Sequence, residues 1–98
     1  MTDVTMVRIY FTEGDRKLEP LMYYLHEVAK VRGVTVFRAV SGFGKSGSLH
    51  SSSLLDLSLN LPLVVEFFDS PTKAKKILKE LSKTVESGHM VSWSANLH

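Results

Sequence analysis

Cysteine is absent from this chain of 98 residues. Its absence excludes disulfide bonds, a thiolate nucleophile and a zinc site with cysteine ligands. Long apolar runs are also missing, because stretches such as Leu61 to Val65 are far shorter than the roughly 20 residues of a membrane-spanning helix. The N-terminus lacks the basic and apolar regions of a signal peptide. We therefore predict a cytoplasmic protein with no segment inserted in a membrane.

The chain also has little excess charge, with a formal net charge of +2. Its basic residues cluster mainly on one predicted helix and do not alternate with stacking aromatics, so we expect no nucleic-acid binding. The 44% hydrophobic content is enough for one core, and we expect a single domain over residues 1–98. Small domains often cover a remaining apolar face by association, which makes a homo-oligomer the natural expectation.

Six segments show the periodicity of regular structure. Segments rich in β-branched and aromatic residues predict strands at 4–12, 34–41, 61–68 and 90–94. Apolar residues at helical spacing predict helices at about 20–32, with Gly33 as its C-cap, and from Pro71 towards Gly88, with Ser70 as N-cap. This order predicts an α+β, ferredoxin-like β-α-β-β-α-β sandwich, in which two helices cover one face of an antiparallel sheet.

The segment 41–60, between the second and third predicted strands, has two halves of different character. The first half is rich in glycine and serine, which disfavours regular structure, so we expect a loop. In the second half leucine occupies every odd position from Leu55 to Leu63, a period of two that predicts a strand arm. Pro62 cannot donate a hydrogen bond to a ladder, so we expect a bulge or an edge strand there.

Three charged residues fall inside predicted strands. Arg8, Arg38 and Glu66 alternate with apolar neighbours, and in the ferredoxin-like order the third strand lies between the first and the second. If all three point to the helix-free face, Glu66 can bridge both arginines across neighbouring strands, and their apolar neighbours then favour a subunit interface. The alternative is that each charge is a solvated residue on a wet sheet face.

Residues 39–46 fit a loose phosphate-loop pattern, and Asp69 ends an apolar strand as a magnesium-binding aspartate would. The following segment, 47–53, is a poor helix start, whereas a phosphate loop must open a helix, and the chain is too short for the parallel sheet of that class. What remains is that backbone N–H groups of a glycine-rich turn beside Lys45 can cradle an anion.

Nothing in the sequence predicts an active site. Ser46, His50 and Asp56 can be drawn as a triad, but all three lie on one loop that does not hold a base and a nucleophile in place. The histidines lack the short spacing of metal ligands, so we expect no metal; they are His26, His50, His89 and His98. We therefore expect that the chain is not an enzyme.

The combination of segments resembles the PII nitrogen-regulatory proteins and, more closely, the uncharacterised PII-like proteins grouped as a domain of unknown function. The resemblance rests on the strand that runs into Gly42-Phe43-Gly44, the long excursion that follows, and the return through Leu61-Pro62 to Glu66. Further matching segments are Val7-Arg8-Ile9-Tyr10 with Glu13, Pro20-Leu21, Val36-Phe37-Arg38, His50 and Leu57-Ser58.

The resemblance implies a ferredoxin-like trimer whose sheets face inward and whose intersubunit clefts bind a small effector, in PII an adenine nucleotide such as ATP or ADP. It implies that segment 41–60 is the T-loop, which docks on a regulated partner protein such as a transporter or an enzyme. The implied ligand-binding residues are those of the loop base and of the turn before the last strand, with Arg38 and Lys45 as replacement cations for phosphate: Arg38, Gly42, Phe43, Gly44, Lys45, Gly88 and His89.

Four features depart from the PII pattern. The 41–60 segment contains no tyrosine to accept a uridylyl group, the turn 86–89 is short, His89 replaces the usual lysine, and the chain ends at His98 without an arginine-bearing tail. Lys17 is a further candidate cation for a bound phosphate. The alternative function is an accessory subunit without a small ligand, which docks through the leucine-rich arm of residues 54–61.

Overall fold

The computed structural model describes residues 1–43, 50–51 and 61–98 of the chain. In chain order its elements are β1 (Thr2–Thr12), a 3-10 turn η1 (Glu13–Asp15), α1 (Leu18–Tyr23), a π-helical turn η2 (Tyr24–Val28), β2 (Gly33–Arg38), β3 (Ser41–Gly42), β4 (His50–Ser51), β5 (Pro62–Asp69), α2 (Pro71–Leu81) and β6 (Met90–Leu97).

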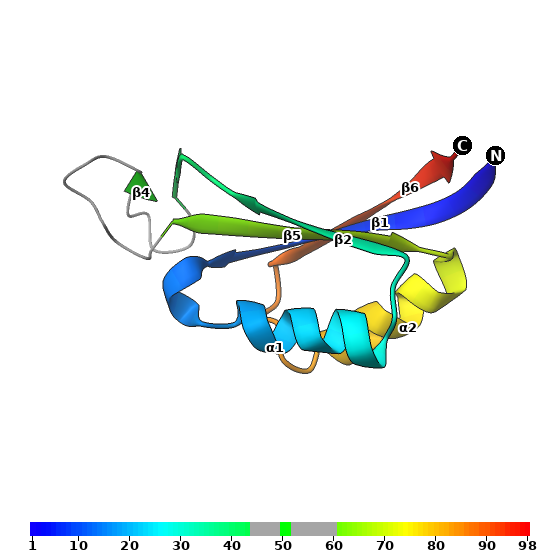
Figure 1. Cartoon of the computed structure of the whole chain (residues 1–98), viewed down its shortest axis with the longest axis horizontal. Helices are drawn as coiled ribbons and strands as arrows, with labels where there is room; N and C mark the ends of the chain where they lie inside the picture. The colour runs from blue at the N-terminus through cyan, green and yellow to red at the C-terminus, as the bar shows by residue number, and fades with distance from the viewer. Residues whose placement is uncertain (44–49, 52–60) are drawn as a thin grey trace.

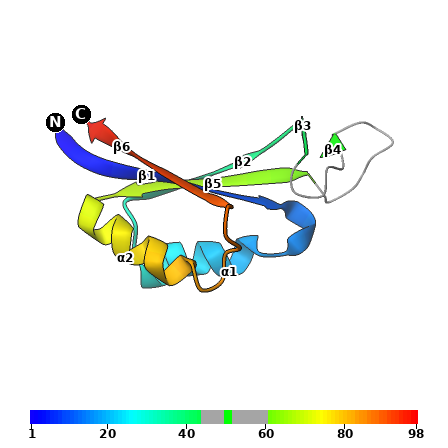
Figure 2. The same ribbon diagram turned by 180° about the vertical axis from the view of Figure 1, so that it is seen from behind.

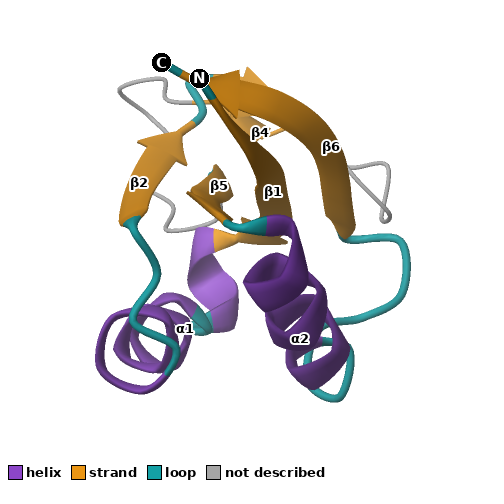
Figure 3. Cartoon of the chain, turned by 90° about the vertical axis from the view of Figure 1, so that its right-hand side faces the viewer, coloured by secondary structure: helices purple, strands orange, loops and turns teal. Residues whose placement is uncertain are grey.

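Four strands form one antiparallel sheet in the order β2-β5-β1-β6, while β3 and β4 pair separately. Both helices lie on the same face of this sheet, as Figures 1 and 3 show from two directions. Figure 2 shows the two termini side by side at one end of the sheet, where Thr2 pairs with Leu97. The ferredoxin-like α+β prediction is confirmed.

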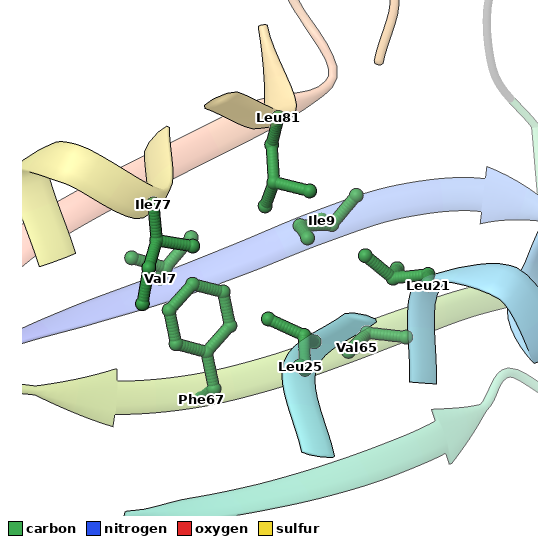
Figure 4. Close-up of a cluster of buried hydrophobic side chains, with 8 residues drawn as sticks. All are labelled: Val7, Ile9, Leu21, Leu25, Val65, Phe67, Ile77 and Leu81. Carbon is green, nitrogen blue, oxygen red and sulfur yellow. The ribbon is translucent and has the colours of Figure 1, made fainter. Parts of the chain in front are cut away.

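The core lies between the helices and the covered face of the sheet. Along β5 every second residue is buried, including Val65 and Phe67, neither of which has any exposed surface. Leu25 and Ile77 reach them from the helix side, as Figure 4 shows. This alternation is what a sheet with one helix-covered face requires, because neighbouring strand residues point to opposite faces.

The first helix differs from the prediction of a regular helix over 20–32 that ends at Gly33. It begins at Leu18 and widens into the π-helical turn, and Lys30 (φ 53°) takes the left-handed position after it. The Lys30 carbonyl accepts a hydrogen bond from Lys73 Nζ at 2.7 Å, which ties this turn to α2. Gly33 instead begins β2, so its assignment as a C-cap is wrong.

The second helix begins as predicted, because the Ser70 side chain accepts a hydrogen bond from the Lys73 N–H at 3.3 Å and Pro71 occupies the first turn. It ends at Leu81, earlier than expected, and turns lead to Gly88, whose φ of 88° is a left-handed conformation that favours glycine. The last strand runs to Leu97 rather than ending at residue 94.

Pro62 is the first residue of β5, which lies inside the sheet between β2 and β1. The expectation of a bulge or an edge strand is therefore wrong. The first residue of a strand is a third position that tolerates a missing N–H group. The strand arm predicted for residues 55–60 lies outside the described residues.

Candidate functional site

The side of the sheet opposite the helices, which we call the open face, carries large apolar side chains. The registers of the sheet place on it Met6, Arg8, Tyr10, Thr35, Phe37, Val64, Glu66, Phe68, Val91 and Trp93. Phe37 is 46% exposed, Val91 48% and Trp93 40%. Large apolar side chains that gather on one exposed face of a small domain indicate a surface that binds a ligand or another protein.

Arg8 lies at the centre of the open face. Its Nε is 2.8 Å from Glu66 Oε1 on the neighbouring strand, and its guanidinium lies 5.9 Å from the ring centroid of Phe37 and 5.6 Å from that of Trp93. The hydrogen bond with Glu66 raises the pKa of Arg8 above its ordinary value. The predicted Arg8–Glu66 pair is confirmed, and the two flanking aromatics hold the arginine by cation–π attraction.

Arg38 does not join this pair, so the prediction that Glu66 bridges both arginines is wrong. Arg38 pairs in register with Leu63, whereas Glu66 pairs with Thr35. Arg38 therefore shares its parity with Val36, which packs against the core on the helix-covered side. Its guanidinium forms an ion pair with Glu13 at the end of the sheet.

A hollow of about 250 Å³ lies on the open face beside Glu66. Thr35 and Glu66 bring polar side chains to it, and Phe68 brings an aromatic ring. The hollow is smaller than the 300–1,000 Å³ or so of a typical small-molecule pocket. A single chain thus offers only part of a binding site here.

At the base of the 41–60 segment, the backbone of Gly42 closely approaches the ring of Pro62. A Cβ on Gly42 would lie 3.0 Å from Pro62 Cγ, so a larger residue would force this contact apart. The Ala39 N–H donates to the Pro62 carbonyl at 2.9 Å and closes the base. Phe43 is 73% exposed. Gly44, Lys45 and most of the leucine-rich arm lie outside the described residues, and their roles stay predictions.

The turn before β6 holds the other predicted group. His89 Nδ1 lies 3.0 Å from the Tyr10 carbonyl oxygen, and the Tyr10 N–H donates to the His89 carbonyl at 2.9 Å. His89 Nε2 lies 3.7 Å from a carboxylate oxygen of Glu86. With Nδ1 donating to a carbonyl, the histidine is held in one orientation at the start of the edge strand.

Within one chain the predicted ligand-binding residues form two separate groups. Arg38 ends the edge strand β2 and Gly42 follows it, whereas Gly88 and His89 precede the opposite edge strand β6, and two strands lie between them. Both groups are at the same end of the sheet as Glu13 and Pro62. One chain does not bring them into a single cradle for phosphate groups.

Phe37 and Trp93, which flank Arg8, were not predicted as site residues. The parity expected for Arg38 puts its neighbour Phe37 on the covered face, whereas the register places Phe37 on the open face. Among residues 1–43, 50–51 and 61–98 no cluster of three or more histidine, aspartate or glutamate side chains could hold a metal ion. None of the helices in this part of the chain has the length and apolar character needed to cross a membrane.

The fold is similar to that of solved PII-like proteins. The structure aligns with CPII, a PII-like protein from Thiomonas intermedia, solved with bound ADP, AMP and bicarbonate (TM-score 0.65, 18% identity, 97% of this chain and 86% of that one). It aligns as well with a structure described as a PII-like signaling protein from Thermus thermophilus (TM-score 0.63, 18% identity, 98% and 88% covered).

The family follows from the sequence comparisons. The DUF190 family model, described as an uncharacterized ACR, matches residues 4–97. A UPF0166 protein of Aquifex aeolicus is 42% identical over 76 residues, which cover 72% of each chain, and one of Methanocaldococcus jannaschii is 26% identical over 95 residues, covering 93% of this chain and 87% of that one. The chain belongs to the DUF190 family.

Proposed function

We propose that this chain is a PII-like regulatory protein that assembles through its open face, binds an adenine nucleotide between subunits and regulates a partner protein through its 41–60 segment. The observation that carries the proposal is the open face itself, with its exposed aromatics around a paired arginine. The proposal is of a binding protein, not an enzyme, and its place in the cytoplasm stays a prediction from the sequence.

Assembly through the open face is favoured by how its central charges are arranged. Burying an unpaired charge is costly, but Arg8 already has Glu66 as a partner within the chain. Phe37, Val91 and Trp93 around it would gain from leaving water. Three inward-facing copies, as in a trimer, would bury these side chains together.

The hollow beside Glu66 suits one end of a nucleotide. Phe68 offers a ring against which a planar base can pack, and Thr35 offers a hydroxyl group for hydrogen bonds to its edge. A neighbouring subunit would complete this hollow into a cleft. Support for an adenine nucleotide comes from CPII, a protein of the same fold that was solved with ADP and AMP.

The hollow lies at the end of the sheet where Thr2 pairs with Leu97, so the phosphate groups would meet loop bases that neighbouring subunits supply. Arg38, Gly42 and Phe43 would act from one chain and Gly88 and His89 from another, with Gly44 and Lys45 as further candidates. Because the Glu13 carboxylate forms an ion pair with the Arg38 guanidinium, a phosphate would have to bind Arg38 beside that carboxylate or displace it. Such an exchange would alter the base of the 41–60 segment, which gives the effector a route to the partner-binding segment.

Thermal unfolding with ATP, ADP, AMP and cyclic AMP tests the effector. A nucleotide at a hundred times its Kd stabilises the protein by about 2.7 kcal/mol, which raises Tm by roughly 10–20 °C in a domain of this size. Thr35→Val removes a hydroxyl from the hollow and should reduce the shift, whereas Lys76→Gln, on an exposed helix face, should leave it unchanged. Absence of a shift with every nucleotide would contradict the effector.

A further inference from the structure

A pocket of about 480 Å³ lies on the helix-covered side, between the start of α1 and the end of α2. Its floor is apolar and includes Ile9, Leu21 and Leu81, and Figure 4 shows both leucines pointing from their helices towards Ile9. Phe11 and Val85 extend the apolar wall. The volume falls in the range of small-molecule pockets, roughly 300–1,000 Å³, and all of its lining comes from one chain.

The charges at the mouth of this pocket are unevenly neutralised. Among the described residues, neither Arg16 nor Lys17 has an ion-pair partner, and both line the pocket from the turn after β1. On the opposite rim, Glu80 pairs with Lys83 at 3.0 Å, and a carboxylate oxygen of Glu86 lies 3.7 Å from His89 Nε2. Asp15 adds a third carboxylate to the lining. The pocket as a whole is therefore not positive, and its positive charge is confined to the rim that Arg16 and Lys17 form.

Two unusual backbone features flank the pocket. Arg16 has a φ of 55°, a left-handed conformation that costs a non-glycine residue roughly 1 kcal/mol and tends to occur where function requires it. Tyr24 begins the π-helical turn, and its side chain lines the pocket; such turns are frequent at functional sites. Burial, followed by the nearby Glu80 charge, raises the pKa of Tyr24, so its hydroxyl stays a hydrogen-bond donor.

We propose that this pocket binds a small monoanion with an aromatic or branched apolar body, namely an aromatic or branched-chain carboxylate. The apolar body lies on Ile9, Leu21 and Leu81, and the carboxylate lies at the mouth beside Arg16 and Lys17. Apart from His89, which also lines it, this pocket shares no residue with the proposed intersubunit nucleotide cleft, and it lies on the helix-covered side of the sheet.

Titration of the labelled protein by NMR with 3-phenylpropionate tests the site, with 3-phenylpropionamide as the neutral control. The acid should perturb the backbone signals of Leu21, Tyr24, Leu81 and Val85, and it should bind at least about tenfold more tightly than the amide, since a charge-assisted contact is worth more than 1.4 kcal/mol. Equal affinities of acid and amide would overturn the proposal, and so would perturbations confined to the open face.

Two pairs of variants sharpen this test. Arg16→Asn combined with Lys17→Gln should weaken binding of the acid about tenfold or more, and asparagine tolerates the left-handed conformation at position 16. Lys75→Gln, on the exposed face of α2, should leave binding unchanged. Unchanged affinity in the double variant would overturn the proposal.

The second pair of variants tests whether a bulky side chain at the mouth blocks the pocket. Thr84 lines the pocket and is exposed, so Thr84→Trp should block the mouth, whereas Ser87→Trp, which lies outside the lining, should not. Both variants are checked for unchanged circular dichroism. Full binding by Thr84→Trp would count against the pocket. Nucleotide-induced Tm shifts measured on the same variants should persist, so the two proposals can fail separately.

Discussion

The two faces of the sheet differ in how completely their apolar residues are covered. On β5, Val65 and Phe67 are fully buried under the helices, while Val64 and Phe68 on the open face are only partly buried. Both sets are equally apolar in sequence. A strand that is apolar on both faces is typical of a sheet covered on both sides, so the open face is the surface that a second molecule would cover.

The polar groups on the two faces differ in the same way. On the covered side the Asp69 carboxylate is buried and is fully engaged by backbone N–H groups and Lys73. On the open face Arg8 and Glu66 satisfy each other but remain partly exposed. The covered side holds the chain together, and the open side is the surface through which we propose that another chain binds.

The largest expected effect comes from the covered side. Phe67→Ala should lower the free energy of unfolding by about 3–5 kcal/mol, because it leaves a cavity in the core. Phe37→Ala, its counterpart on the open face, should weaken self-association while changing the unfolding of the dissociated chain little. Urea denaturation monitored by the fluorescence of Trp93 compares them, and equal losses would break the distinction between the faces.

Asp69→Ala should have the second-largest effect on the free energy of unfolding. The substitution removes the acceptor of the Arg32 N–H at 3.1 Å and of the Ser70 N–H at 2.8 Å. Leaving such donors without a partner should cost about 2 kcal/mol, measured by the same denaturation. On the open face, Glu66→Gln should change the unfolding of the dissociated chain far less. A smaller effect at Asp69 than at Glu66 would contradict the comparison.

Arg8 and Glu66 should be coupled in self-association. Arg8→Met or Glu66→Gln alone would leave one charge unpaired in the interface, so each should weaken association. The double variant buries no unpaired charge and should weaken it by less than the two single effects combined. Sedimentation equilibrium of the four proteins measures this, and strictly additive effects would show that the pair stays in water.

Tyr24 should give the smallest effect, and only at alkaline pH. Because its pKa is raised in the folded protein, its contribution to stability is present below a pH of about 10 and is lost as pH rises through the raised value. Tyr24→Phe should therefore lose less stability than the unaltered protein over this alkaline range. Chemical denaturation at pH 7 and in this range checks it, and parallel losses would contradict it.

The periodicity of the sequence was sufficient for the fold because local patterns and tertiary packing agree. The alternation around Val65 and Phe67 and the Ser70-Pro71 start of α2 both follow from local chemistry. The end of α1 did not follow, because the left-handed residue is Lys30, whose carbonyl is held by Lys73 from a distant helix. Only the folded chain brings these two residues together.

The candidate site was harder to predict because it depends on register. The pairing of Arg8 with Glu66 needed only the order of the strands, and it was predicted. Arg38 needed the alignment of β2 with β5, where Thr35 rather than Arg38 lies opposite Glu66. A shift of one residue moves a side chain to the other face. The pocket between the helices depends on residues distant in sequence and left no local signal.

The most direct test of the account is the mass of the protein in solution. Sedimentation velocity at micromolar concentration should show a trimer for the unaltered chain and a folded monomer for Val91→Lys, which adds a second cation beside Arg8. Ser94→Lys, at an exposed position of the opposite parity on β6, should remain trimeric. A monomeric unaltered chain, or a trimeric Val91→Lys variant, would contradict the assignment of the open face as a subunit interface.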